Sequence, residues 1–179
     1  MKRLLLIVTA VALLWGCAPV ISREILQEVN RGITFAELRK APQAYRGEVV
    51  LLGGVIVKTV NKKEGTLLEV YQAEIDRRDK PINLDVSGGR FLALYEGLLE
   101  KEIYREGRRI TIAGIVKGAQ VMKLGEIDYR YPYLIIKDIH LWKKEQPIRY
   151  EPYPWGPWGP WWYPWHPRDP WYDPYWRCR

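Results

Sequence analysis

The 179-residue sequence predicts a mainly β protein: a small antiparallel barrel with one or two short helices, between an apolar N-terminal segment and an irregular Pro/Trp/Tyr-rich tail. Three observations predict this arrangement. Short β-branched runs with apolar alternation and glycine-containing turns fill the middle of the chain. The chain begins with two basic residues, which an apolar run follows. Seven of the nine tryptophans and eight of the thirteen prolines lie after residue 150.

The N-terminal segment has the layout of an export signal. Lys2 and Arg3 are basic, and residues 4–15 are almost wholly apolar. This run is shorter than the roughly 20 apolar residues that a membrane-spanning helix needs, and Pro19 would interrupt a continuing helix. We therefore predict a signal peptide over residues 1–16.

The last residues of this segment, Leu14-Trp15-Gly16-Cys17, resemble the lipobox of bacterial lipoproteins. In such proteins the cysteine sulfur receives a diacylglycerol, the chain is cut before the cysteine, and the new amine is acylated. The resemblance implies cleavage between Gly16 and Cys17, and attachment to membrane lipid through Cys17. Ala18, where an aspartate would signal retention in the inner membrane, implies the outer membrane. An ordinary signal followed by a structural cysteine is the alternative.

Cys178 is the second of only two cysteines in the chain. If Cys17 carries lipid, it has no thiol for a disulfide. Cys178 is then either an unpaired residue of the tail or a site of intermolecular pairing.

The net charge of +7 falls to about +5 when Lys2 and Arg3 leave with the signal, because 7 − 2 = 5. This modest excess suits anionic lipid headgroups, lipopolysaccharide or nucleic acid. We expect no nucleic-acid partner for an exported lipoprotein, and a solvated basic surface is the default interpretation. The oligomeric state is not indicated.

Two short helices are expected before the strands. Residues 22–30 carry apolar side chains at helical spacing, and residues 17–32 are predicted to form a tether with this helix. Thr34 and Glu37 form a T-x-x-E capping box that begins a second helix, which Pro42 ends.

The barrel domain is predicted over residues 33–146, and its first strand over residues 48–60. Gly53-Gly54 inside this strand predicts a bend that lets it serve two halves of a barrel. Residues 61–65 read as a hairpin loop, and residues 66–72 as the returning strand.

The remaining elements follow in order along the chain. We predict a long loop over 73–90, a strand over 90–96, one or two helical turns over 98–104, a strand over 109–117, a turn at Gly118-Ala119 into 120–124, and a last strand over 133–142. This order fits a five- or six-stranded antiparallel barrel of the OB type, a partly open Greek key. Another small β-sandwich is the alternative.

Five stretches within residues 17–142 carry a resemblance to a known family: "CAPVIS", "ITFAELRKAPQAYRGEVVLLGGVI", "SGGRFLALYEG", "GEIDYRYPYL" and "IHLW". Together they resemble the Slp family, the starvation-inducible outer membrane lipoproteins. The resemblance implies a lipid-anchored outer membrane protein of Gram-negative bacteria, associated with starvation or stress and without known catalytic activity. We expect the barrel to face the periplasm.

Residues suited to catalysis do not converge in the sequence. Glu126 and Asp128 would offer acid/base chemistry from a loop, but loop solvation explains them better. Residues 87–90, "SGGR", would offer backbone N–H groups to an anion, although a turn before a strand explains them better. His140 and His166 are isolated, so we predict no catalytic residue, no metal site and no cofactor beyond the lipid on Cys17.

Aromatic residues supply the candidate binding surface. Tyr129, Tyr131 and Tyr133 alternate in one stretch, and would form a recognition surface or pack over an open end of the barrel. The other candidates are Trp142 and the tail tryptophans Trp155, Trp158, Trp161, Trp162 and Trp165.

The tail, residues 147–179, is too rich in proline for a helix or an interior strand. Its aromatic side chains suit the membrane–water interface, sugar rings or cations, and the tail would also serve to cover the barrel or a second copy. The alternative is a low-complexity segment with no fixed partner. We predict a non-enzymatic structural or binding protein of the envelope, with a protein or glycan partner. The alternative is an OB-type module that binds peptidoglycan or lipopolysaccharide.

Overall fold

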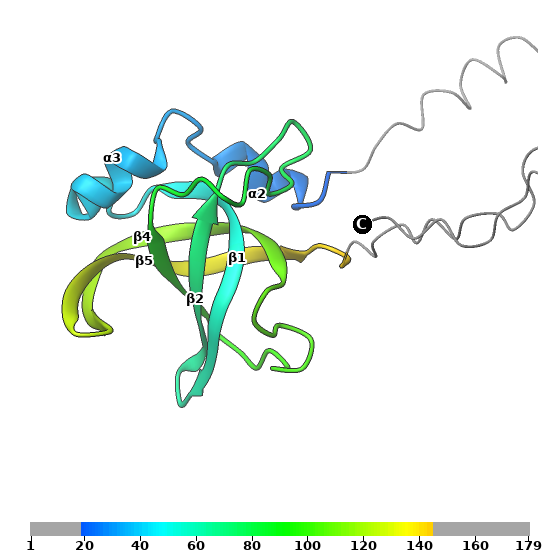
Figure 1. The fold of residues 1–179 in the computed structure, drawn as a ribbon. Coiled ribbons are helices and arrows are strands. Elements are labelled where there is room, and N and C mark those ends of the chain that lie inside the picture. Colours follow the sequence, from blue (N-terminus) through cyan, green and yellow to red (C-terminus); the bar gives the residue numbers. More distant parts are fainter. Residues whose placement is uncertain (1–18, 145–179) are drawn as a thin grey trace, which may run out of the picture. The chain divides into compact units, whose positions relative to one another are not determined.

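The structure, a computed structural model, describes residues 19–144, and Figure 1 shows their fold. Five strands close into a barrel in the order β1-β2-β3-β5-β4. The strands are β1 (Val49–Lys62), β2 (Gly65–Ala73), β3 (Arg90–Tyr95), β4 (Arg109–Leu124) and β5 (Ile127–Leu141). This arrangement confirms the mainly β fold and the small OB-like barrel.

The bend predicted in the first strand is present, and it lets β1 pair with two different strands of the barrel. The first half of β1 pairs with β4 through Val49–Val55, and the second half pairs with β2 through Gly53–Lys62. The two registers overlap at the glycine pair. A Cβ on Gly54 would collide with the carbonyl oxygen of Tyr71, so this position requires glycine where the two halves meet.

One pairing differs from the predicted antiparallel barrel. β3 and β5 run parallel, with Leu92 opposite Tyr133 and Leu94 opposite Ile135. The parallel pairing follows from the directions of the other strands. β3 runs with β1, β4 pairs antiparallel with β1, and β5 returns from β4, so β5 runs in the direction of β3 when it closes the barrel.

Two short α-helices precede the strands, α2 (Arg23–Glu28) and α3 (Phe35–Lys40), and a 3₁₀ turn, η1 (Pro42–Tyr45), follows them. The capping box of α3 is complete. The backbone N–H of Glu37 donates to Thr34 Oγ1 at 3.3 Å, and the Glu37 carboxylate accepts the Thr34 N–H at 2.9 Å. Helix α3 can thus begin abruptly, and it places Phe35 and Leu38 in the barrel core.

The core fills the barrel with side chains from every strand. These buried residues include Val50, Leu52, Ile56, Leu68, Val70, Phe91, Ala93, Ile110, Ile112, Val116, Leu134 and Ile136. Leu99, from the connection between β3 and β4, joins them. The interior of the barrel is therefore packed with apolar side chains.

Of the one or two helical turns predicted over residues 98–104, one is present. One turn closes when the Tyr104 N–H donates to the Glu100 carbonyl at 2.9 Å. Thr66 Oγ1 meanwhile accepts the Leu99 N–H at 2.9 Å and donates to the Gly97 carbonyl at 3.1 Å. These bonds hold the chain before this turn against β2.

The β4–β5 hairpin is longer than predicted. Gly118 is not a turn but an irregularity within β4, opposite Tyr133, and its φ of +116° explains why glycine stands there. The chain reverses at Gly125 instead, and β5 begins at Ile127, six residues before the predicted strand. Figure 1 shows this hairpin curling away from the end of the barrel at which the described chain begins and ends.

Candidate functional site

The three candidate tyrosines lie on the outer face of β5. A strand points successive side chains to opposite faces, and Leu134 and Ile136 belong to the core inside the barrel. Tyr129, Tyr131 and Tyr133 therefore share the outward face, as their alternation in the sequence predicts.

This outer face contains a second small core. Tyr131 packs with Leu67 of β2 and with Leu92 and Leu94 of β3, and its side chain is only 2% exposed. Tyr129, Tyr133 and Ile135 lie around this cluster and are half-buried. The β4–β5 hairpin thus lies across strands β2 and β3 and covers apolar side chains that point out of the barrel.

Polar contacts hold the hairpin in this place. The Glu69 carboxylate accepts hydrogen bonds from Tyr131 Oη at 3.1 Å and from Arg90 Nη1 at 2.7 Å. The backbone N–H of Arg90 donates to Tyr129 Oη at 3.0 Å. The rings of Tyr129 and Tyr131 meet edge to face, with centroids 4.6 Å apart. We call Glu69, Arg90, Tyr129 and Tyr131 the clamp.

The electrostatics of the clamp favour a neutral phenol. Burial raises the pKa of Tyr131 to about 12, and the neighbouring Glu69 carboxylate adds to the effect. The hydrogen bond to Glu69 raises the pKa of the Arg90 guanidinium above its ordinary value. Tyr131 therefore stays protonated at neutral pH and acts as a hydrogen-bond donor to Glu69, which is a structural role.

Trp142, the fourth candidate of the barrel domain, does not join the tyrosines. It lies just beyond the other end of β5, next to Arg109, whereas Tyr129 pairs with Met122 near the hairpin turn. Its indole N–H donates to Thr111 Oγ1 at 2.9 Å, and its ring packs on His140 at 4.6 Å. The tyrosines and Trp142 thus form two separate surfaces.

Three backbone N–H groups of the glycine loop at residues 87–90 are engaged and are not available to an anion. The N–H of Gly88 donates to Gln72 Oε1, that of Gly89 to Ser87 Oγ, and that of Arg90 to Tyr129 Oη. Each of these bonds lies within the protein. The turn interpretation is therefore confirmed. A shallow hollow beside the loop is lined by Ala36, Arg39, Lys40, Ser87 and Gly88, and the Arg39 guanidinium is already bonded to the Gly88 carbonyl.

The two carboxylates considered for acid/base chemistry are exposed at the hairpin turn. Asp128 lies in β5, not in a loop, and forms an ion pair with Lys123 at 2.8 Å. Glu126 lies in the turn itself. Within residues 19–144 no group of three His, Cys, Asp or Glu side chains is placed to hold a metal ion. No helix in that range is long and apolar enough to cross a membrane.

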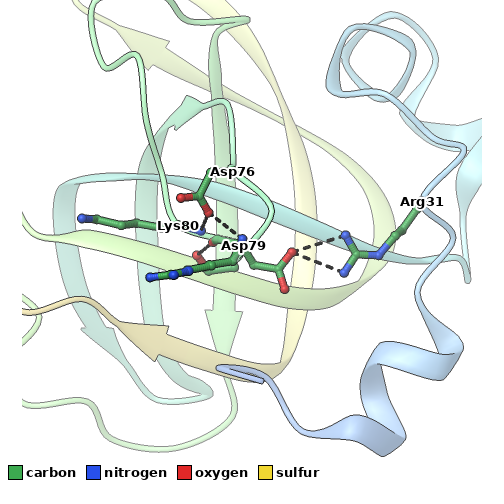
Figure 2. A network of polar contacts seen from close by, with 6 residues as sticks. Arg31, Asp76, Asp79 and Lys80 are labelled. Carbon is green, nitrogen blue, oxygen red and sulfur yellow. Dashed lines mark hydrogen bonds and ion pairs between the residues drawn. The ribbon is translucent and has the colours of Figure 1, made fainter. Parts of the chain in front are cut away.

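Two features were missed by sequence reasoning. One is the clamp, for which the outward position of Glu69 was the available signal. The other is a polar network at the end of the barrel, in which Arg31 donates to Asp79 Oδ1 at 3.3 Å while Asp76 Oδ1 accepts the backbone N–H of Lys80 (Figure 2). The carbonyl of Asp79 also accepts a hydrogen bond from Thr111 Oγ1.

The remaining candidates lie outside the described residues. They are Gly16 and Cys17 at the predicted cleavage and lipidation site, and Trp155, Trp158, Trp161, Trp162 and Trp165 of the tail.

Comparison with known proteins gives one family. The profile of the Outer membrane lipoprotein Slp family matches residues 14–176. The uncharacterized lipoprotein YeaY of Escherichia coli K12 is 30% identical over 137 residues, which cover 75% of this chain and 70% of that protein. The outer membrane protein Slp of the same organism is 28% identical over 109 residues, covering 61% and 57%.

A protein of Haemophilus influenzae is 30% identical over 109 residues, covering 60% of this chain and 59% of that protein. The match thus spans less than two thirds of two of these three relatives. Among solved structures, a mitochondrial single-stranded DNA binding protein of Saccharomyces cerevisiae, Rim1, aligns with 55% of this chain and 98% of its own length, at 13% identity and a TM-score of 0.33.

Proposed function

Since the chain belongs to the Slp family of outer membrane lipoproteins, we propose that it is held in the outer membrane by acylated Cys17 and faces the periplasm. The observation that carries this proposal is the lipobox at residues 14–17, which lies at the start of the family match. Each buried methylene contributes about 0.8 kcal/mol to membrane binding, and stable anchoring takes more than one chain. The diacylglycerol and N-acyl chains on one cysteine meet that requirement.

The test is to replace the cysteine in the full chain. We expect Cys17→Ser to lose its place in the outer membrane fraction, because no acyl chain is attached. Cys178→Ser is the matched control, and it should fractionate as the unmodified chain does. Retention of the Cys17→Ser protein in the outer membrane, resistant to salt, would contradict lipid anchoring through this residue.

We propose a structural or binding role without catalysis. In support, the interior of the barrel is filled by apolar side chains, and the polar side chains of the clamp are engaged with one another. Glu126 and Asp128 lie at an exposed hairpin turn, where water screens their charges. Alanine at both positions should leave unchanged any turnover that is measured with the protein.

A role in starvation or stress, which the resemblance of the sequence to the Slp family implies, is part of the same proposal. It predicts that the amount of the protein per cell rises when growth stops. Quantifying the protein in growing and in starved cells measures this directly, and equal amounts in both would count against it.

Binding of an envelope glycan remains the alternative proposal. On the barrel, stacking on a sugar ring needs an open aromatic face, and Tyr131 is only 2% exposed, whereas Tyr129, Tyr133 and Trp142 are half-buried. We therefore expect glycan binding, if it occurs, to depend mainly on the tryptophans of residues 147–179. Retention on peptidoglycan or lipopolysaccharide by the whole chain, and its loss without those residues, would favour it. Equal retention with and without them would count against stacking by the tail.

A further inference from the structure

Residues 21–30 are bound to the barrel, although they were predicted to belong to a tether. Ile21 is completely buried. The backbone N–H of Ser22 donates to Asp138 Oδ2 at 2.8 Å, and Glu28 forms an ion pair with Lys137, so both ends of α2 are attached to neighbouring residues of β5. The N–H of Asn30 then donates to the Val49 carbonyl at 2.8 Å. These contacts fix the segment at both ends.

The length of chain left between lipid and barrel is therefore very short. From Cys17 to Ile21 there are 21 − 17 = 4 residues, which reach at most about 14 Å when fully extended. This is comparable to the distance of roughly 8–10 Å over which charges act in physiological salt. A lipid on Cys17 leaves the barrel too little chain to turn over freely or to stand away from the bilayer.

Three segments meet at the end of the barrel where the chain enters. The loop at residues 76–80 is joined to the N-terminal segment by the ion pair of Arg31 with Asp79, which Figure 2 shows. The end of β5 is joined to the same loop, because Trp142 Nε1 donates to Thr111 Oγ1 and Thr111 Oγ1 donates to the Asp79 carbonyl. We call residues 19–28, 76–80 and 142–144 together the anchor face.

The anchor face is rich in basic side chains. The exposed ones, including the neighbouring Arg31, are Arg23, Arg31, Arg77, Arg78, Lys143 and Lys144. The carboxylates of the anchor face are Glu24, Glu28, Asp76 and Asp79; Glu24 is exposed, Glu28 pairs with Lys137, and Asp79 pairs with Arg31. With Lys80 and the neighbouring Arg31 included, seven basic residues stand against these four carboxylates, which leaves a net charge of 7 − 4 = +3. This charge suits the phosphates of anionic lipid headgroups.

We propose that the barrel lies on the membrane with its anchor face against anionic lipid headgroups, in one fixed orientation. The inference rests on the proposed lipid anchor at Cys17. In this orientation the turn of the β4–β5 hairpin points away from the bilayer, because Leu141 pairs with Ile110 at the anchor end of the hairpin and Ile127 pairs with Leu124 at the other. Figure 1 shows the turn on the side opposite to the start and the end of the described chain.

The test uses the full, lipidated chain in vesicles of phosphatidylethanolamine and phosphatidylglycerol. In a Cys178→Ser background, a fluorescent label is attached to Gln27→Cys on α2 or to Glu126→Cys at the hairpin turn, both exposed positions. Lipids with a nitroxide on the headgroup quench fluorophores close to the surface. We expect the label at position 27 to lose most of its fluorescence and the label at position 126 to keep most of it.

A spacer variant is the matched control. About ten Gly and Ser residues between Ala18 and Pro19 add a reach of ~17 Å without changing a described residue. This insertion should reduce the difference between the two labels while salt-resistant binding to the vesicles persists.

The outcomes separate the two proposals. Protein that salt washes from the vesicles would overturn the lipid anchor, and with it the orientation. Salt-resistant protein with equal quenching at both positions, or with stronger quenching at the turn, would overturn the orientation alone.

Discussion

At the scale of the residue, the clamp decides what the outer face of the barrel can do. Glu69 is the acceptor for both Arg90 and Tyr131, so neither the guanidinium nor the phenol is available to a ligand without breaking a bond inside the protein. A partly buried acceptor left without its donors is costly. The clamp therefore stabilises the hairpin against β2 and β3.

Tyr131 gives the clamp a pH dependence that can be measured. Its pKa is raised from 10.0 to about 12, so its contribution to stability is complete below pH 10 and is lost as pH rises toward 12. At 1.36 kcal/mol per unit, the loss is on the order of 2–3 kcal/mol in the free energy of unfolding. Tyr131→Phe should remove this part of the alkaline loss, measured by denaturant unfolding at pH 9.5 and at pH 11.5.

Tyr45→Phe, a half-buried tyrosine of η1, is the control for this experiment. It should keep the alkaline loss of the unmodified chain. An identical alkaline loss in the Tyr131→Phe and Tyr45→Phe proteins would contradict the assigned role of Tyr131.

Gly65 tests the packing at the β1–β2 hairpin. Its φ is +138°, and a Cβ there would overlap the carbonyl oxygen of Tyr95. Gly107 also has a positive φ, +80°, but open space surrounds it. Gly107→Ala should therefore cost about 1–2 kcal/mol from its backbone conformation, and Gly65→Ala about 4 kcal/mol or more. Equal losses in denaturant unfolding would show that the β3 backbone moves aside.

At the scale of the element, the capping box fixes the start of α3, whose Phe35 and Leu38 pack into the core of the barrel. Thr34→Ala should reduce the free energy of unfolding by about 1 kcal/mol, because the Glu37 N–H loses its acceptor. The matched control is Ser22→Ala, since Ser22 stands at the N-cap of α2 without a side-chain capping bond. Its loss should be close to zero, and a loss as large as that of Thr34→Ala would mean that the capping bond contributes little.

Local signals predicted the elements that depend on local chemistry. The T-x-x-E motif located α3, the glycine pair located the bend of β1, and apolar alternation located β2 and the first half of β4. The parallel β3–β5 pair and the length of the hairpin depend on how the barrel closes, which no short window contains. Likewise, alternation placed Tyr129, Tyr131 and Tyr133 on one face, but the burial of Tyr131 requires outward leucines from two other strands.

At the scale of the whole molecule, the described residues fill the core of the barrel among themselves. Within residues 19–144, the buried side chains of the core cluster run from Phe35 to Ile136. Removing residues 147–179 should therefore leave the midpoint of thermal unfolding unchanged within error, measured by circular dichroism on the barrel with and without the tail. A clear fall of the midpoint would mean that the tail contributes to folding.

The proposed lipid on Cys17 and the anchor face together would hold the barrel close to the membrane through a short stretch of chain. The sequence alone predicted the lipid but treated residues 17–32 as a tether. It offered no sign that Ile21 is buried or that Ser22 meets Asp138, because these contacts join positions 116 residues apart. In the proposed arrangement, the contacts of residues 21–30 with the barrel give the barrel a fixed orientation relative to the lipid on Cys17.

The most direct test of this account is the intact mass of the protein extracted from membranes. The account predicts a chain that begins at Cys17 and carries a diacylglycerol on sulfur and an acyl chain on the new amine. A chain that retains residues 1–16, or one that begins at an unmodified Cys17 with a free thiol, would contradict it.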